Sequence, residues 1–261
     1  MIYCECLFFL LLILINAFLK NGREILINLI DGSYKDKFWE KFNVLDSEII
    51  NIKNVIRGLT FVIDCKCDIS NFHSLSVYNI SCIMCQYFNL SKIETYDVMI
   101  GSLLHDIGKL AIPDEILKKE SSLTKEEFEV MKNHVIYTYE ILYNLKNDRI
   151  LNIAANHHEK LNGKGYPRGI SNLSLSERIV SVVDIFVALI QKRPYKEGFK
   201  KEKVIEILNR SVEVGEIDDK VVNSIIENYD YLESINSKVY NKYREKIKLL
   251  YNNCKNFIYK N

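Results

Sequence analysis

Histidines and acids gather in the middle of this sequence in a pattern that suits a metal centre. All five histidines lie between residues 73 and 158, so the first 72 residues and the last 103 contain none. Imidazole and carboxylate without thiolate form a ligand set for iron or manganese, and less selectively for zinc or nickel. The candidate ligands are His73, His105, Asp106, His134, His157, His158 and Asp184.

The position of Asp184 supports a metal site, because this acid interrupts the very apolar segment 175–189. An unpaired carboxylate buried there would be costly, so it needs a cation. Seven ligands exceed what one ion needs from the protein if a coordination position is to remain open. Two ions that share a bridging carboxylate fit the set better and leave room for a hydroxide.

Helices are the elements expected to position these residues. Apolar residues recur at three- and four-residue steps through 38–72 and 73–88, and further helices are expected at 96–104, 150–157, 175–189 and 237–258. Thr124 followed by Glu127 predicts a capping box at the start of the helix that carries His134. The intervening segment 159–173 holds three of the ten glycines and predicts a loop. No segment alternates as a strand would, so the predicted fold class is all-α.

Composition describes an ordinary globular protein. Hydrophobic residues make up 48% and charged residues 26% of the 261 positions. The formal net charge of +1 provides no overall field to attract a nucleic acid polymer, so none is expected as a partner. The seven cysteines, including the pair Cys82 and Cys85, are expected to be reduced thiols that are buried or partly buried, which indicates the cytosol.

The N-terminal segment 1–30 contains an apolar stretch at 7–19. As a helix this stretch would cover roughly 20 Å, short of the ~30 Å hydrocarbon core of a bilayer, although an extension back to Met1 would suffice. Lys20 and Arg23 follow it directly, so an anchor here would leave the rest of the chain in the cytoplasm, at the inner face of the membrane. A membrane anchor and a buried or interfacial helix remain alternatives.

Five motifs make a family resemblance specific. "LLHDIGKLAIPDEIL", "LTKEEFEVMKNH", "NHHEKLNGKGYPRG", "LSERIVSVVDIF" and "KRPYKEG" follow one another in the order and near the spacing of the HD-GYP family. The resemblance implies an HD-superfamily helical bundle with extra helices at both ends. We therefore expect a connecting helix at 31–50, the HD-GYP catalytic domain at 51–232 and an amphipathic helix at 233–261, which would serve for packing or for a homodimer surface.

The same resemblance implies roles for single residues. Asp106 would bridge two ions, one also held by His73, His105 and Asp184, and the other by His134, His157 and His158. Lys109 would face the bridging hydroxide and the scissile phosphate, which makes it and Asp106 the catalytic pair. The substrate-binding residues would be Gly165, Tyr166 and Pro167, together with Arg193 and Lys196.

The sequence departs from the family pattern at several positions. Some members hold a third ion through a glutamate four residues before the first histidine, where this chain has Ile69. We therefore expect two divalent transition-metal ions, most simply iron or manganese. Val187 replaces an aspartate of the family, and Leu161, Asn162 and Gly163 stand where "W-D-G" is usual. These changes concern substrate contacts and the support of the ligands.

The family resemblance implies a two-metal phosphodiesterase that opens cyclic di-GMP to linear pGpG, GMP or both in second-messenger signalling. Two alternatives stay open. One is a hydrolase of another cyclic dinucleotide or nucleotide, which the altered Asn162 and Val187 allow. The other is a non-catalytic receptor for cyclic di-GMP, although a receptor has no need to keep all seven ligands.

Overall fold

The computed structural model of the chain describes Thr60, Ile63, Asp64 and residues 72–191 and 198–258. The chain divides into two compact units, residues 1–62 and 63–261, and the helices described below belong to the second. The expected segments 1–30 and 31–50 lie outside the described residues, as do Ile69, Arg193 and Lys196. Within the described residues, no helix combines the length and apolarity needed to cross a membrane.

Helices and turns make up the described part of the chain, which contains no strand and so confirms the all-α class. In chain order the elements are α4 (His73–Tyr87), α5 (Lys92–Leu104), the 3₁₀ helix η1 (Ile107–Ala111), α6 (Asp114–Leu117), α7 (Lys125–Leu142), η2 (Tyr143–Leu145), α8 (Asp148–Ala155), α9 (Leu175–Ile190), α10 (Lys201–Glu213), α11 (Asp219–Glu227) and α12 (Tyr229–Ile258).

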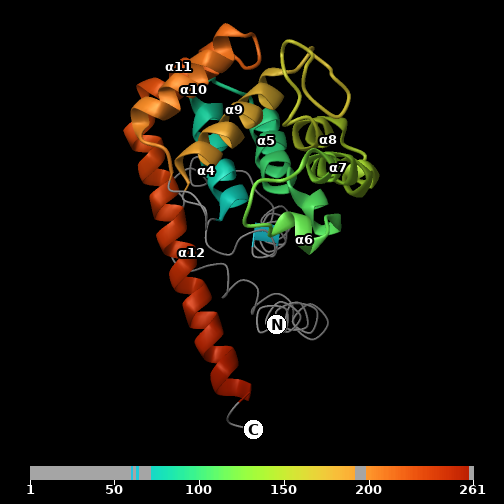
Figure 1. Cartoon of the computed structure of the whole chain (residues 1–261). Helices are drawn as coiled ribbons and strands as arrows, with labels where there is room; N and C mark the ends of the chain where they lie inside the picture. The colour runs from blue at the N-terminus through green and yellow to red at the C-terminus, as the bar shows by residue number, and fades with distance from the viewer. Residues whose placement is uncertain (1–59, 61–62, 65–71, 192–197, 259–261) are drawn as a thin grey trace. The chain divides into compact units, whose positions relative to one another are not determined.

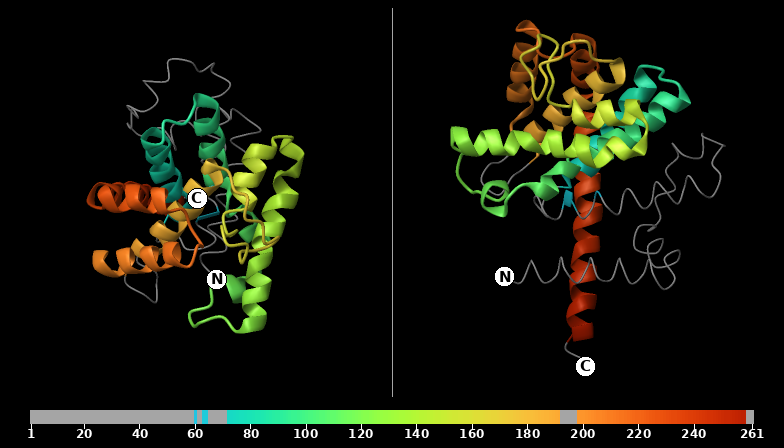
Figure 2. Two further views of the ribbon diagram at one scale, coloured as in Figure 1. Left: turned by 90° about the horizontal axis from the view of Figure 1, so that it is seen from above. Right: turned by 90° about the vertical axis from the view of Figure 1, so that its right-hand side faces the viewer.

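Helix α9 lies at the centre of the arrangement. It packs against α4, α5 and α8 as well as α10 and α11. The two views of Figure 2, together with Figure 1, place α10 and α11 on one side of α9 and α7 with α8 on the other. A helix surrounded in this way needs apolar residues on most of its faces. The sequence of α9 meets that need with buried residues that include Ile179, Val183 and Phe186.

Capping boxes define where several of the helices begin. The Ser91, Thr124 and Ser174 side chains each accept a hydrogen bond from the backbone of the glutamate three residues later, and that glutamate accepts one in return. The box predicted at Thr124 and Glu127 is thus present. These caps satisfy backbone N–H groups that the first turn leaves without helical partners. They fix the starts of α5, α7 and α9, the helices that lead to or carry His105, His134 and Asp184.

Helix α4 begins differently. Its N-cap residue Phe72 has a φ of 47° and offers no capping side chain. The buried carboxylate of Asp64 takes that role, accepting from the Ser74 N–H at 3.1 Å and from the Leu75 N–H at 3.4 Å. A residue outside the helix, ten positions before Ser74, therefore holds the helix end at which His73 lies.

The last helix begins earlier than its apolar pattern predicted. Helix α12 starts at Tyr229 rather than near residue 237, and Tyr229 and Leu232 are fully buried beside the core of the bundle. It packs against α4, where the rings of Phe72 and Tyr243 have centroids 5.4 Å apart. Figure 1 shows it as the long red helix that begins beside α11 and passes α4.

Candidate metal centre

The predicted ligands His73, His105, Asp106 and Asp184 come together from three helices. His73 is the first residue of α4, His105 caps the end of α5, and Asp184 lies within α9. His73 Nε2 lies 2.7 Å from Asp184 Oδ1, and His105 Nε2 lies 3.3 Å from Asp106 Oδ2. His105 Nε2 is also 3.8 Å from Asp184 Oδ1. Four potential ligand atoms therefore face a common point.

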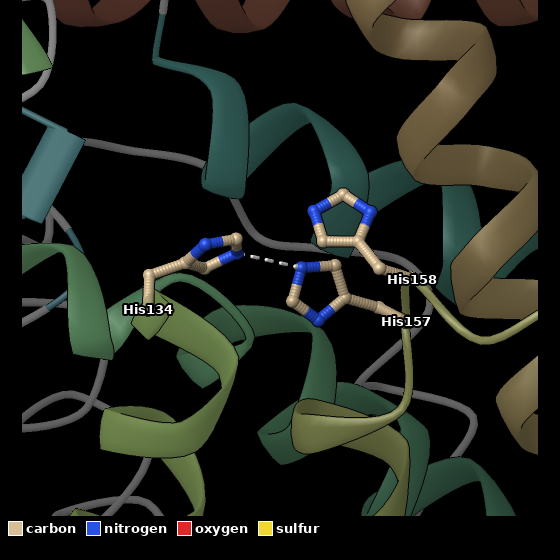
Figure 3. A group of neighbouring side chains, drawn as sticks. All are labelled: His134, His157 and His158. Atoms are coloured by element: carbon tan, nitrogen blue, oxygen red, sulfur yellow. Dashed lines mark hydrogen bonds between the residues drawn. The ribbon is translucent and has the colours of Figure 1, made fainter. Parts of the chain in front are cut away.

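A second cluster consists of His134, His157 and His158, whose ligand atoms lie within 4.8 Å of one another. His134 comes from α7, whereas the other two follow α8, which ends at Ala155 rather than continuing to the histidine pair as predicted. Figure 3 shows the three rings turned toward one another, with His134 Nε2 3.3 Å from His157 Nε2. Because the helix has ended, adjacent residues can point into the same cluster.

Asp106 lies between the two clusters. While its Oδ2 faces His105, its Oδ1 lies 3.6 Å from His134 Nε2 and 4.0 Å from His157 Nε2. The two oxygens of one carboxylate thus face different groups of imidazoles. This geometry suits a carboxylate that is shared between two cations.

Backbone carbonyls orient three of the imidazoles. The Nδ1 atoms of His105, His134 and His157 lie 2.7 to 2.8 Å from the carbonyl oxygen of the residue three positions earlier. A carbonyl oxygen can only accept a hydrogen bond, so each Nδ1 carries the proton and donates it. In the neutral ring the Nε2 atom then keeps its lone pair, the form in which histidine binds a metal.

Two buried polar atoms support the fit of this donor set to metal ions. Among the described residues, neither His105 Nε2 nor Asp106 Oδ1 has a hydrogen-bond partner, although both are inaccessible to solvent. Buried polar atoms without partners are rare because desolvation is costly. A divalent cation bound by imidazole and carboxylate would satisfy both atoms.

Charge and burial set the protonation of the site. Burial lowers the pKa of His134 to about 4 and that of His158 to about 3, so both rings are neutral near pH 7. Burial opposes ionisation of Asp106, but the charges of Lys109 and His105 outweigh it and hold the pKa of this carboxyl well below its usual range. Neutral imidazoles and an ionised carboxylate are the forms that coordinate metals.

Lys109 contacts the shared carboxylate directly. Its Nζ donates to Asp106 Oδ2 at 2.6 Å, and the side chain is 23% exposed. The two residues are linked by the 3₁₀ helix η1, in which positions three apart align on one face. The ammonium group therefore lies at the edge of the metal centre, where solvent can reach it.

The predicted substrate loop lies against the second cluster. Tyr166 stacks on His158 with ring centroids 4.8 Å apart, and its N–H donates to the His158 carbonyl at 3.2 Å. A Cβ added to Gly165 would lie 2.6 Å from the carbonyl carbon of Glu159, so only glycine fits that close approach. The structure thus brings Tyr166 to the second cluster and packs Gly165 against the backbone that follows His158.

Two residues that support the site, Glu159 and Thr138, were not predicted from the sequence. The buried carboxylate of Glu159 accepts from the backbone N–H groups of Arg168, at 2.7 Å, and Ile170, at 3.1 Å, which ties the ends of the loop together. Thr138 Oγ1 donates to the His105 carbonyl at 3.0 Å and accepts from the Gly108 N–H at 3.0 Å. The adjacency of Glu159 to the histidine pair is a usable signal, whereas Thr138 acts from another helix.

The matching family model is consistent with this centre. The model described as "HD domain" matches residues 60–221 of the chain. The chain belongs to the HD domain family. The matched range contains His105 and Asp106, and it confirms the resemblance inferred from the motifs.

Curated relatives of this HD domain chain are named as phosphodiesterases of cyclic dinucleotides. It is 35% identical over 191 residues to the cyclic di-GMP phosphodiesterase of Thermotoga maritima, covering 69% of the chain and 48% of that protein. It is 32% identical over 196 residues to the 3'3'-cGAMP-specific phosphodiesterase 1 of Vibrio cholerae, covering 73% and 44%. The chain therefore spans less than half the length of either relative.

A solved structure shares the fold. A protein of Bdellovibrio bacteriovorus described as an HDG"Y"P protein superimposes with a TM-score of 0.55 at 21% identity, covering 81% of this chain and 74% of that one. This likeness confirms the helical bundle expected of an HD domain.

Proposed function

We propose that the chain is a metal-dependent phosphodiesterase that hydrolyses cyclic dinucleotides. The observation that carries this proposal is the position of Asp106, whose two oxygens face two separate groups of imidazoles. A pair of divalent ions sharing a carboxylate is a common device for hydrolysing phosphate esters. The relatives named as cyclic di-GMP and 3'3'-cGAMP phosphodiesterases support the class of substrate.

The proposed ligands divide into two sets that share Asp106. His73, His105 and Asp184 would hold one ion, and His134, His157 and His158 the other. We propose iron or manganese, because imidazole with carboxylate and no thiolate suits these metals. When bound, two such ions supply a water of lowered pKa and neutralise charge that builds on the phosphoryl oxygens.

Lys109 would add a cation from the protein. Its ammonium group is held at Asp106 by the 2.6 Å hydrogen bond, and it is partly exposed. A phosphate that enters the centre would therefore meet a fixed positive charge. We propose that Lys109 donates to a phosphoryl oxygen and contributes more in the transition state, where the oxygen carries more charge.

We propose cyclic di-GMP as the substrate and linear pGpG, GMP or both as products. Tyr166, stacked on His158, would form part of the wall that receives the dinucleotide. Arg193 and Lys196 are proposed to reach its bases or phosphates, because Arg193 offers a planar fork for two hydrogen bonds. A cytoplasmic location is proposed with this function, since Cys82 and Cys85 are buried, reduced thiols.

Hydrolysis of 3'3'-cGAMP is a second candidate. The similarity to the 3'3'-cGAMP-specific phosphodiesterase of Vibrio cholerae is comparable in extent to that with the cyclic di-GMP enzyme. The departure at Asn162 also bears on this choice. Asn162 accepts from the Lys164 N–H at 3.0 Å and donates to the Val214 carbonyl at 3.1 Å, so it braces the substrate loop.

Turnover of both dinucleotides by the purified, metal-loaded chain tests the proposal. We expect hydrolysis of cyclic di-GMP with a higher kcat/KM than that of 3'3'-cGAMP, and loss of both activities in the Asp106→Ala variant. The reverse preference would favour the second candidate. Binding of either dinucleotide without turnover, in protein shown to contain two ions, would instead indicate a receptor and would contradict the proposed enzyme.

A further inference from the structure

His73 differs from the other oriented histidines in how its ring is held. His105, His134 and His157 each donate from Nδ1 to a carbonyl three residues earlier. His73 is the first residue of α4, so no preceding turn of that helix offers it a carbonyl. Its ring must find an acceptor elsewhere in the fold.

The acceptor is the side chain of Gln191, the residue that caps the end of α9. Gln191 Oε1 lies 3.3 Å from His73 Nδ1. Because an amide oxygen can only accept, this contact places the proton on Nδ1. His73 Nε2 faces the first group of ligands and lies 2.7 Å from Asp184 Oδ1, which also can only accept, so a proton lies between these two atoms. A bound cation would take the place of that proton and use the Nε2 lone pair, while Nδ1 keeps its proton toward Gln191.

The orientation of the Gln191 amide is itself determined by its neighbours. The side chain is buried, and its Nε2 donates to Ser76 Oγ at 3.2 Å and to Asn236 Oδ1 at 2.9 Å. If the amide turned over, its NH₂ group would face His73 Nδ1 and its oxygen would face the oxygen of Asn236. Two acceptors would then be in contact unless Asn236 turned over as well, so the two amides keep their orientation as a pair.

We propose that Gln191 is a positioning residue that keeps His73 in the tautomer able to bind a divalent cation, and that Asn236 orients Gln191 from α12. The C-terminal helix is thereby part of the metal centre as well as a packing element. This inference rests on the metal ligands of the proposed function and is independent of the substrate. Partners of this kind typically change metal affinity 10- to 100-fold.

Titration of the full chain with Mn²⁺ against a competing chelator tests the role of Gln191. Gln191→Leu keeps the bulk but removes the acceptor, and we expect one of two ions to bind about 10- to 100-fold more weakly. The ion at His134, His157 and His158 should be affected less. Gln191→Glu should restore binding, because its carboxylate accepts from His73 while Ser76 and Asn236 can both turn to donate.

Variants of α12 test whether Asn236 orients Gln191. Asn236→Leu should weaken the same ion, whereas Asn236→Asp should not, since aspartate still accepts from Gln191. Asn241→Leu is the matched control, because Asn241 is exposed on the same helix. Circular dichroism confirms that each variant is folded.

The outcomes separate this inference from the proposed function. A wild-type chain that binds no Mn²⁺ would overturn both. A wild-type chain that binds two ions, with folded Gln191→Leu and Asn236→Leu variants that bind both as tightly, would overturn only the role of Gln191. An equal loss of affinity for both ions, or the same loss of affinity in Gln191→Glu as in Gln191→Leu, would show that the contacts merely support packing.

Discussion

A single carboxylate connects the two groups of ligands in this chain. Asp106 is buried, faces His105 with one oxygen and His134 with the other, and also accepts a hydrogen bond from Lys109. Replacing it would remove the only carboxylate of the proposed set that faces both groups of imidazoles. The proposed ligand set therefore predicts that replacing the shared ligand changes the metal content more than replacing a ligand of one ion.

Replacement of Asp106 should remove more metal than replacement of His134. We expect Asp106→Ala to lose both ions and His134→Ala to retain one, because His134 belongs to only one of the two groups. Elemental analysis of anaerobically purified protein measures the difference, with about two ions expected in the wild type. Retention of two ions in folded Asp106→Ala would contradict the proposed bridge.

Replacement of Lys109 should affect turnover rather than metal content. A cation beside Asp106 repels a metal ion, so its removal should not weaken metal binding. If the ammonium contributes mainly in the transition state, Lys109→Ala should lower kcat by about 10²-fold or more with little change in KM. Steady-state kinetics with measured metal content checks this.

Lys118→Ala is the matched control for Lys109→Ala. Lys118 also pairs with an aspartate, Asp114, at 2.7 Å, but both side chains are about half exposed and the pair is on the surface. It should leave kcat unchanged. Wild-type turnover in Lys109→Ala would mean that the proposed cation plays no part in the chemistry.

Close contact between elements places His134 beside the HD pair. Gly108 in η1 packs directly on α7, and Thr138 links the Gly108 N–H to the His105 carbonyl. A Cβ at Gly108 would lie 2.6 Å from the Thr138 nitrogen and 2.8 Å from the His134 carbonyl carbon. Both atoms belong to helical backbone, which a side-chain rotation cannot move aside.

Gly108→Ala should therefore destabilise the protein and disturb the metal centre. We expect a loss of about 1–3 kcal/mol or more in the free energy of unfolding, together with weaker binding of the ion assigned to His134. Gly215→Ala is the control, because its Cβ has room and its φ of +68° causes only backbone strain. Denaturant unfolding and metal titration measure both effects, and equal metal affinity in Gly108→Ala and wild type would contradict this view of η1.

At the scale of the whole molecule, the bundle buries imidazoles that must remain neutral. Burial keeps the pKa of His134 at about 4 and that of His158 at about 3 in the folded chain. In the unfolded chain such rings titrate near 6.5, a value typical of exposed histidine. The unfolded state therefore binds more protons than the folded state at mildly acidic pH.

Metal-depleted protein should consequently lose stability as the pH falls from about 6.5 toward 4. Thermal unfolding measured across this window checks the sign. Burial acts to lower the pKa of His105, but the carboxylates of Asp106 and Asp184 outweigh it and raise that pKa to about 9. The stability from His105 is fully present below about 6.5 and is lost only as the pH rises toward 9, outside the window.

The variant His134→Gln provides the control for this pH dependence. Glutamine has no titratable group, so the loss of stability between about pH 6.5 and 4 should be smaller in the variant than in the wild type. An unchanged slope would show that His134 does not stay neutral in the folded, metal-depleted chain.

Sequence patterns alone predicted the helices and the set of candidate ligands. Apolar periodicity indicates which face of a helix is buried, and capping residues such as Thr124 indicate where a helix begins. Both signals are local, because they depend on residues a few positions apart. The histidines were recognisable because the chain contains only five, and Asp184 because it interrupts an apolar helix. The ends of helices were predicted less accurately. Helix α12 begins before its predicted start, because the core buries Tyr229 and Leu232 before the amphipathic pattern becomes regular.

Only the tertiary structure decided how those ligands are held. The contacts of Asp64 with Ser74, of Thr138 with His105 and of Gln191 with His73 join residues 10, 33 and 118 positions apart. Each depends on the distance and direction between two atoms after the helices have packed, and no periodicity encodes that. The arrangement in which the two oxygens of Asp106 face two groups of imidazoles also depends on packing. It requires α5, α7 and the end of α8 to converge on one carboxylate.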